Sequence, residues 1–77
     1  MTAKPTVVVR QDWAKRAVVD AGGVNAWAEA LGVDKSTASR QLTGTVEASQ
    51  RFIAAVLLRY PVTFERAFDV IEGELAA

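Results

Sequence analysis

The chain has 77 residues, a length that fits one small domain with a single hydrophobic core. Nine Lys and Arg balance nine Asp and Glu, and 51% of the residues are apolar, so the composition indicates a folded domain without a general attraction to nucleic acid. The chain has no Cys and no His, which excludes disulfides, thiolate nucleophiles and the usual zinc sites.

The first ten residues differ in composition from the rest. Residues 6–9 are β-branched throughout, which favours an extended backbone. Three alternatives stay open for the run Val7 to Val9: a strand that pairs across a dimer, a frayed first turn of the following helix, or a disordered arm. We therefore divide the chain into an N-terminal arm or short strand over residues 1–10 and a helical domain over residues 11–77.

Glycine and proline residues split the remainder into helix-sized segments, which predicts an all-α domain of five helices. The first helix covers residues 11–21. A short second helix covers residues 25–31, with Asn25 as its N-cap. The third covers residues 35–43, with Asp34 as its N-cap and Gly44 at its end.

Two further helices are predicted in the C-terminal half. Thr45 is the expected cap of the fourth, which ends before Pro61 because proline cannot continue a helix. Thr63 is the expected cap of the fifth. Its apolar stripe has the spacing i, i+4, i+7 and i+11 and consists of Phe64, Phe68, Ile71 and Leu75.

Residues 24–44, VNAWAEALGVDKSTASRQLTG, have the pattern that a helix-turn-helix requires. Ala28 allows two helices to cross closely, and Gly32 can adopt the positive φ that ends a helix. Val33 is expected to fill the angle between the helices. Ala38 and Leu42 are expected to face inward from the second helix of the motif.

This stretch resembles the helix-turn-helix of the lambda-repressor/Cro-like family, which includes phage repressors and bacterial regulators of the xenobiotic-response type. Residues 32–40, GVDKSTASR, are also similar to the equivalent stretch of the lactose-repressor family. The resemblance covers about residues 11–71. The chain departs from the family pattern at Gln41, where an apolar residue is common, so we expect Leu42 to fill that part of the core.

The resemblance implies a sequence-specific DNA-binding transcriptional regulator, namely a small phage or prophage repressor of the Cro type. The second helix of the motif would enter the major groove of double-stranded DNA. The expected groove residues are Lys35, Ser36, Ser39 and Arg40, with Thr37 lying between the groove and the helix–helix contact. Asn25, Thr43 and Thr45 are expected to contact phosphates.

Such a regulator would bind a palindromic operator as a homodimer. The expected dimer surface is the C-terminal helix or the segment from Val7 to Val9. The alternative function is a helix-turn-helix scaffold that binds another protein, as an antitoxin, anti-repressor or host-takeover factor. A purely structural interpretation of the same residues also stays open: Lys35 and Arg40 would form a solvated helix face, and Asp34 would be only an N-cap. Trp13 and Trp27 are expected to be packing residues.

The zero net charge is the sum of two unequal halves. Residues 1–40 carry six basic and four acidic side chains, whereas residues 41–77 carry three and five. The predicted motif lies mainly in the positive half, so we expect specificity from a few contacts with little non-specific attraction to DNA.

Other functional classes lack support in the sequence. No nucleophile–base pair, metal-ligand set or phosphate loop can be assembled, so we expect no enzymatic activity, no cofactor and no metal. No apolar run is long enough for a signal peptide or a membrane span. We expect a soluble cytoplasmic protein without a small-molecule ligand.

Overall fold

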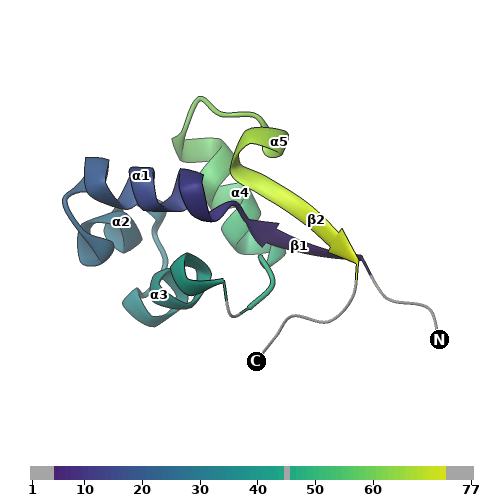
Figure 1. Cartoon of the computed structure of the whole chain (residues 1–77). Coiled ribbons are helices and arrows are strands. Elements are labelled where there is room, and N and C mark those ends of the chain that lie inside the picture. Colours follow the sequence, from purple (N-terminus) through teal and green to yellow (C-terminus); the bar gives the residue numbers. More distant parts are fainter. Residues whose placement is uncertain (1–4, 45, 73–77) are drawn as a thin grey trace.

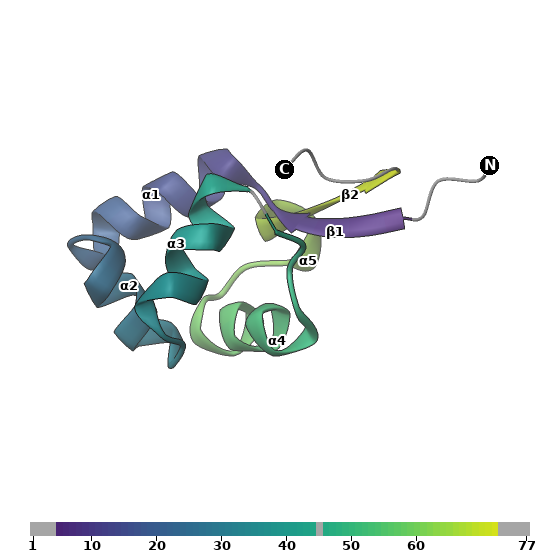
Figure 2. The ribbon, with the colours of Figure 1, turned by 90° about the horizontal axis from the view of Figure 1, so that it is seen from below.

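The computed structural model describes residues 5–44 and 46–72, and in these residues it contains five helices and one two-stranded sheet (Figure 1). The helices form one body, and the sheet extends away from it (Figure 2). The expectation of a mostly helical domain is confirmed, but the all-α assignment is only approximately correct because of the sheet. The elements in chain order are β1 (Pro5–Val9), α1 (Gln11–Ala21), α2 (Val24–Leu31), α3 (Lys35–Thr43), α4 (Gln50–Arg59), α5 (Phe64–Ala67) and β2 (Phe68–Glu72).

The sheet resolves the three alternatives for the N-terminal segment. β1 pairs antiparallel with β2, so that Val9 lies opposite Phe68 and Pro5 lies opposite Glu72. The strand interpretation is therefore correct, but its partner comes from the same chain. Because a lone strand leaves its backbone groups unpaired, the two segments stabilise each other.

The predicted fifth helix is wrong beyond its first turn. α5 ends at Ala67, and Phe68 has an extended backbone with φ −131° and ψ 160°. Pairing with β1 satisfies the backbone of this segment, and Val70 and Ile71 have the β-branched side chains that favour a strand. Phe64 and Phe68 still stack, at 5.2 Å between ring centroids, and Leu75 lies outside the described residues.

Two predicted helix starts also need correction. α2 begins at Val24 with Gly23 at the N-cap, so Asn25 lies inside the helix rather than capping it. α4 begins later than predicted, and its cap is Ser49, whose Oγ accepts a hydrogen bond from the Phe52 N–H at 3.1 Å. The expected cap Thr45 lies outside the described residues.

Aromatic side chains form the centre of the core. Trp27, Phe52 and Phe68 are fully buried, together with Val56. Phe52 makes T-shaped contacts with Trp27 at 5.9 Å and with Phe68 at 6.2 Å between ring centroids. These contacts join α2, α4 and β2, so the core fixes the helices that support α3.

Candidate nucleic-acid interface

A tight turn fixes the angle between α2 and α3. Gly32 has φ 73°, a left-handed conformation that costs glycine little. Its N–H donates to the Glu29 carbonyl, and the Val33 N–H donates to the Ala28 carbonyl, both at 3.1 Å. Val33 packs against the core while Ala28 is buried at the helix contact. These positions therefore have the roles predicted from their spacing.

The start of α3 is capped as predicted. The Asp34 side chain accepts a hydrogen bond from the Thr37 N–H at 2.9 Å. Hydrogen bonds from the Thr37 side chain and backbone hold the pKa of Asp34 below its ordinary value of 3.8. The cap carboxylate is therefore ionised at neutral pH and satisfies an amide of the first turn.

The inner side of α3 is held from two directions. Ala38 is fully buried, and Gln41 is only 3% exposed. The Gln11 Nε2 of α1 donates to the Gln41 carbonyl at 3.3 Å, and the Gln41 Nε2 donates to the Glu47 carbonyl at 3.0 Å. Gln41 thus occupies the interior position that we expected Leu42 to fill. Leu42 is only half-buried at the edge of the core.

Gly44 ends α3 where α1 approaches closely. It has φ 72°, and a Cβ at this position would lie 3.1 Å from the Gln11 Nε2. Its N–H donates to the Gln41 carbonyl at 3.1 Å. The end of the helix is therefore fixed against the first residue of α1.

The outer side of α3 carries cationic and hydroxyl side chains only. Residues three or four positions apart lie on the same side of a helix, and those on this side of α3 are all exposed. α3 contains no Asp or Glu, and the Thr43 hydroxyl donates to the Arg40 carbonyl at 3.0 Å. The residues of this face, which we call the α3 face, are Lys35, Ser36, Ser39, Arg40 and Thr43.

The remaining predicted site residues are not part of the α3 face. Thr37 is half-buried, and its N–H is used by the cap of α3. Asn25 is exposed in the first turn of α2. Thr45 lies outside the described residues.

The sequence interpretation missed two polar residues beside the start of α3. Ser49 and Arg51 line a cavity of about 300 Å³ together with Asp34 and Thr37. Arg51 is exposed, and it adds a cation near the N-terminus of α3. The sequence could have indicated this role for Arg51 if the cap of α4 had been assigned to Ser49, because Arg51 then lies in the first turn of α4.

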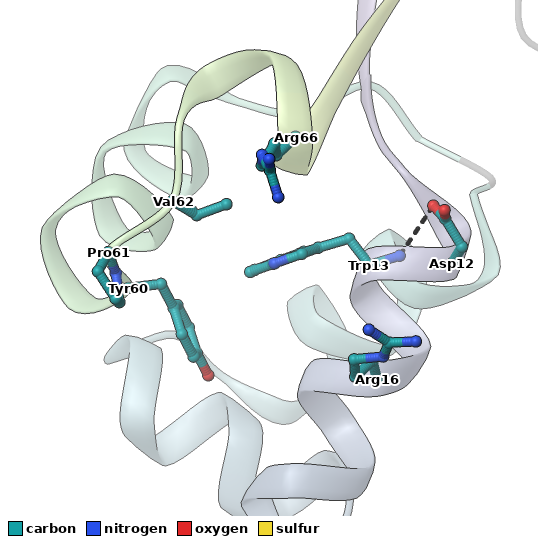
Figure 3. Close-up of a pocket in the computed structure, with 7 residues that line it drawn as sticks. All are labelled: Asp12, Trp13, Arg16, Tyr60, Pro61, Val62 and Arg66. Atoms are coloured by element: carbon teal, nitrogen blue, oxygen red, sulfur yellow. Dashed lines mark hydrogen bonds between the residues drawn. The ribbon is translucent and has the colours of Figure 1, made fainter.

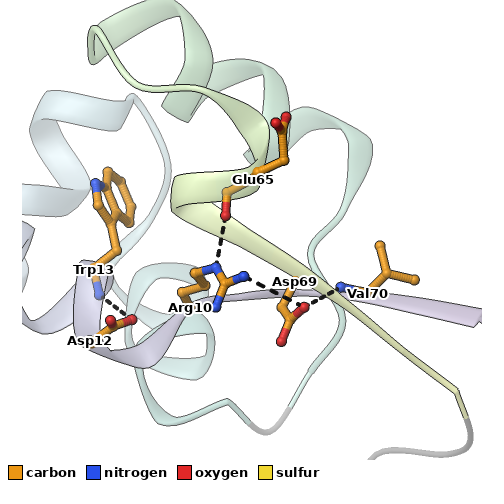
Figure 4. Close-up of polar contacts among 6 residues, drawn as sticks. All are labelled: Arg10, Asp12, Trp13, Glu65, Asp69 and Val70. Carbon is orange, nitrogen blue, oxygen red and sulfur yellow. Dashed lines mark hydrogen bonds and ion pairs between the residues drawn. The ribbon is translucent and has the colours of Figure 1, made fainter.

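Arg10 is held by the C-terminal segment. Its Nε donates to the Glu65 carbonyl at 2.8 Å, and its guanidinium lies 3.9 Å from the Asp69 Oδ1 (Figure 4). Arg10 therefore helps to fix the base of the sheet. Arg10 is therefore not part of a free N-terminal arm that could extend along DNA.

The comparisons with known proteins give no relative: no family model, curated protein or solved structure matches the chain. Within residues 5–44 and 46–72, no helix has the length and apolar character needed to cross a membrane. The same part of the chain contains no group of three or more His, Cys, Asp or Glu side chains that could hold a metal ion.

Proposed function

We propose that the chain is a sequence-specific DNA-binding protein in which α2 and α3 form a helix-turn-helix and the α3 face enters the major groove. The observation that carries this proposal is the contrast between the two sides of α3. Its inner side is tied to α1 and to the segment before α4, whereas its outer side offers cations and hydroxyls without a carboxylate. An α-helix with its side chains has the width of the major groove of B-DNA.

Each side chain of the α3 face has a chemistry suited to this role. Arg40 presents a planar fork that can donate two hydrogen bonds to guanine, and Lys35 supplies a compact positive charge for a phosphate. The hydroxyls of Ser36 and Ser39 can donate to or accept from base edges. Because α3 is capped at its start and hydrogen-bonded to α1 near its end, we expect these groups to reach DNA without a large loss of backbone entropy.

Phosphate contacts would flank the groove contacts. Arg51 and Ser49 are adjacent to the start of α3 and are therefore suited to one phosphate, together with the first amides of α4. Thr43, the last residue of α3, is proposed to contact another phosphate. The same role is proposed for Thr45, which lies outside the described residues. Asn25 is proposed to contact the backbone from the first turn of α2.

We further propose that the protein acts as a dimeric regulator of transcription, of the small phage repressor or Cro type. Both expected dimer surfaces differ from the expectation. The C-terminal helix is short, and one edge of β1 is already paired with β2 of the same chain. The outer edge of β2 offers another surface, where Val70 is 52% exposed. A symmetric contact there would place two α3 faces in one assembly.

Selection from a pool of random DNA duplexes tests this function. We expect the full chain to enrich one sequence with two symmetric half-sites. On that duplex, the pair Lys35→Ala/Arg40→Ala should weaken binding at least about a hundredfold, from the loss of one base contact and one phosphate contact. The pair Lys15→Ala/Arg59→Ala is the matched control, because it removes the same charge from exposed positions of α1 and α4.

Three outcomes are informative. Enrichment with loss of binding in the first pair only would support the proposal. A pool that yields no common sequence would contradict specific recognition. Equal weakening by both pairs would show that binding depends on total charge rather than on the α3 face.

A further inference from the structure

A second surface, distinct from the α3 face, lies between the start of α1 and the connection from α4 to α5. It is an open cavity of about 460 Å³ (Figure 3). Its walls are Trp13, Tyr60, Pro61 and Val62, and its rim carries Arg16, Arg66 and Asp12. We call these residues the Trp13 groove. In Figure 1, the α4–α5 connection and α3 lie on opposite sides of α1.

Two aromatic rings form much of the wall of the Trp13 groove. Trp13 and Tyr60 contact each other edge to face, with ring centroids 5.3 Å apart and an angle of 89° between the planes. Both rings are half-buried, so each retains surface that a ligand can cover. Burial is the main cause that raises the pKa of Tyr60 above 10.0, and the phenol is therefore uncharged at neutral pH.

The rim of the groove is net positive. Trp13 and Arg16 are three residues apart on α1 and therefore share one helix face, while Arg66 approaches from α5. In the described part of the chain, neither Arg16 nor Arg66 makes a hydrogen bond or ion pair through its side chain. Asp12 accepts a hydrogen bond from the Trp13 N–H at 2.9 Å. Two unpartnered guanidinium groups thus flank an apolar floor.

We propose that the Trp13 groove binds a peptide segment of another protein in which an apolar side chain is flanked by Asp or Glu. The apolar side chain would lie on Trp13, Tyr60 and Val62, and the carboxylates would pair with Arg16 and Arg66. Trp, Tyr and Arg are the residues that contribute most to binding energy at protein interfaces. Charge complementarity on the rim selects an acidic partner over a basic one.

The exposure of the groove favours a peptide over a small molecule. Asp12, Arg16, Pro61 and Arg66 are all exposed, so a small ligand would keep much of its surface in water. A peptide covers the apolar floor and reaches both arginines at once. This binding goes beyond the proposed function, because it uses none of the residues of the α3 face.

Selection of random peptides displayed on phage, with the immobilised full chain as bait, tests the inference. We expect enriched peptides to share an apolar residue with neighbouring Asp or Glu. The pair Arg16→Gln/Arg66→Gln should then weaken the binding of a synthetic enriched peptide at least about tenfold, from the loss of two charge-assisted contacts. The pair Lys15→Gln/Arg59→Gln removes the same charge from exposed positions outside the groove and should change the affinity less than about twofold.

Several results would overturn the inference. These are no enrichment, enrichment of peptides without acidic residues, or equal affinity in the two variant pairs. Competition by phenylacetate at the peptide's own concentration would indicate a small-molecule site instead. A dimer that Arg16→Gln/Arg66→Gln dissociates would assign the groove to a second copy of the chain.

The two proposals fail independently. If no duplex is selected but the acidic peptides bind as described, only the DNA-binding proposal is lost. If Arg16→Gln/Arg66→Gln weakens binding of the selected duplex as much as it weakens the peptide, the groove belongs to the DNA interface and the inference is wrong. Lys35→Ala/Arg40→Ala should leave the peptide affinity unchanged.

Discussion

Individual side chains of α3 either position the helix or remain available to a partner. Asp34 caps its first turn, Ala38 allows close packing, and Gln41 connects it to the segment before α4. Lys35 and Ser39 are exposed and face away from these contacts. A substitution on the inner side should therefore change stability, whereas one on the outer side should change binding.

Arg40→Ala should alter specificity as well as affinity. If Arg40 donates two hydrogen bonds to a guanine, its loss costs about 1–3 kcal/mol on the selected duplex and relaxes the preference at one base position. Titration of the variant against duplexes changed at each position measures both effects. A uniform loss across all sequences would mean that Arg40 contacts only phosphate.

The cap at Asp34 predicts a specific dependence of stability on pH. The pKa of Asp34 is lowered in the folded state, so its contribution to stability is complete above its ordinary pKa of 3.8 and is lost as the pH falls through the lowered value. Asp34→Asn keeps a capping side chain that does not titrate. Urea unfolding should show wild type more stable than Asp34→Asn at pH 7, with a difference that shrinks below pH 4.

Glu29→Gln is the matched control for Asp34→Asn. It removes an exposed carboxylate of α2, and the Glu29 side chain caps none of the described helices, since only its backbone carbonyl accepts from the Gly32 N–H. A difference between wild type and Asp34→Asn that stays constant from pH 7 to pH 3 would contradict the role of the ionised cap.

The residues of the α3 face could be predicted from sequence, but Gln41 could not. Helical spacing from the cap at Asp34 is sufficient to separate exposed from buried positions. A buried glutamine, however, depends on an acceptor elsewhere in the chain, and the Glu47 carbonyl is positioned by a segment without regular structure. Local patterns carry no information about such a pairing.

At the scale of elements, the sheet is the feature that sequence periodicity misjudged. Phe64, Phe68 and Ile71 have helical spacing, yet the chain becomes extended at Phe68. β1 requires a partner for its backbone, and β2 is the segment that provides it. Pairing with β1 therefore outweighed the helical spacing of the apolar residues. The spacing within twelve residues gives no information about a partner strand that lies elsewhere in the chain.

An engineered disulfide tests the register of the sheet. Val7 lies opposite Val70, so the pair Val7→Cys/Val70→Cys should oxidise within one chain. The native chain contains no Cys, and the new bridge closes a long loop, so we expect stabilisation of about 2–4 kcal/mol. Mass spectrometry detects the bond, and denaturant unfolding measures the gain.

The offset pair Val7→Cys/Asp69→Cys is the control for this experiment. Neighbouring residues of a strand point to opposite faces, so these two sulfurs should stay reduced. Efficient oxidation of the offset pair would contradict the observed register. A failure of both pairs to oxidise would contradict it as well.

At the scale of the whole molecule, the net charge is zero, but the charged side chains are distributed unevenly over the surface. The α3 face and Arg51 are cationic, Arg10 is paired with Asp69, and the Trp13 groove has its own pair of arginines. DNA affinity should therefore depend on a small number of contacts near α3. The general field of the protein contributes little.

The salt dependence of DNA binding tests this distribution. The logarithm of the association constant should fall with the logarithm of salt concentration by about 0.9 for each phosphate that the protein neutralises. Because Arg51 is expected to neutralise one phosphate, Arg51→Ala should weaken binding to all duplexes alike and reduce this slope by about one. A slope that Arg51→Ala leaves unchanged would remove Arg51 from the interface.

The most direct test of the central claim is a map of amide chemical shifts in the full chain during titration with the selected duplex. We predict the largest changes in Lys35–Thr43 and in the first turn of α4, with small changes around Trp13 and Tyr60. The largest changes in the Trp13 groove or along the sheet, with α3 unaffected, would contradict recognition of DNA by the α3 face.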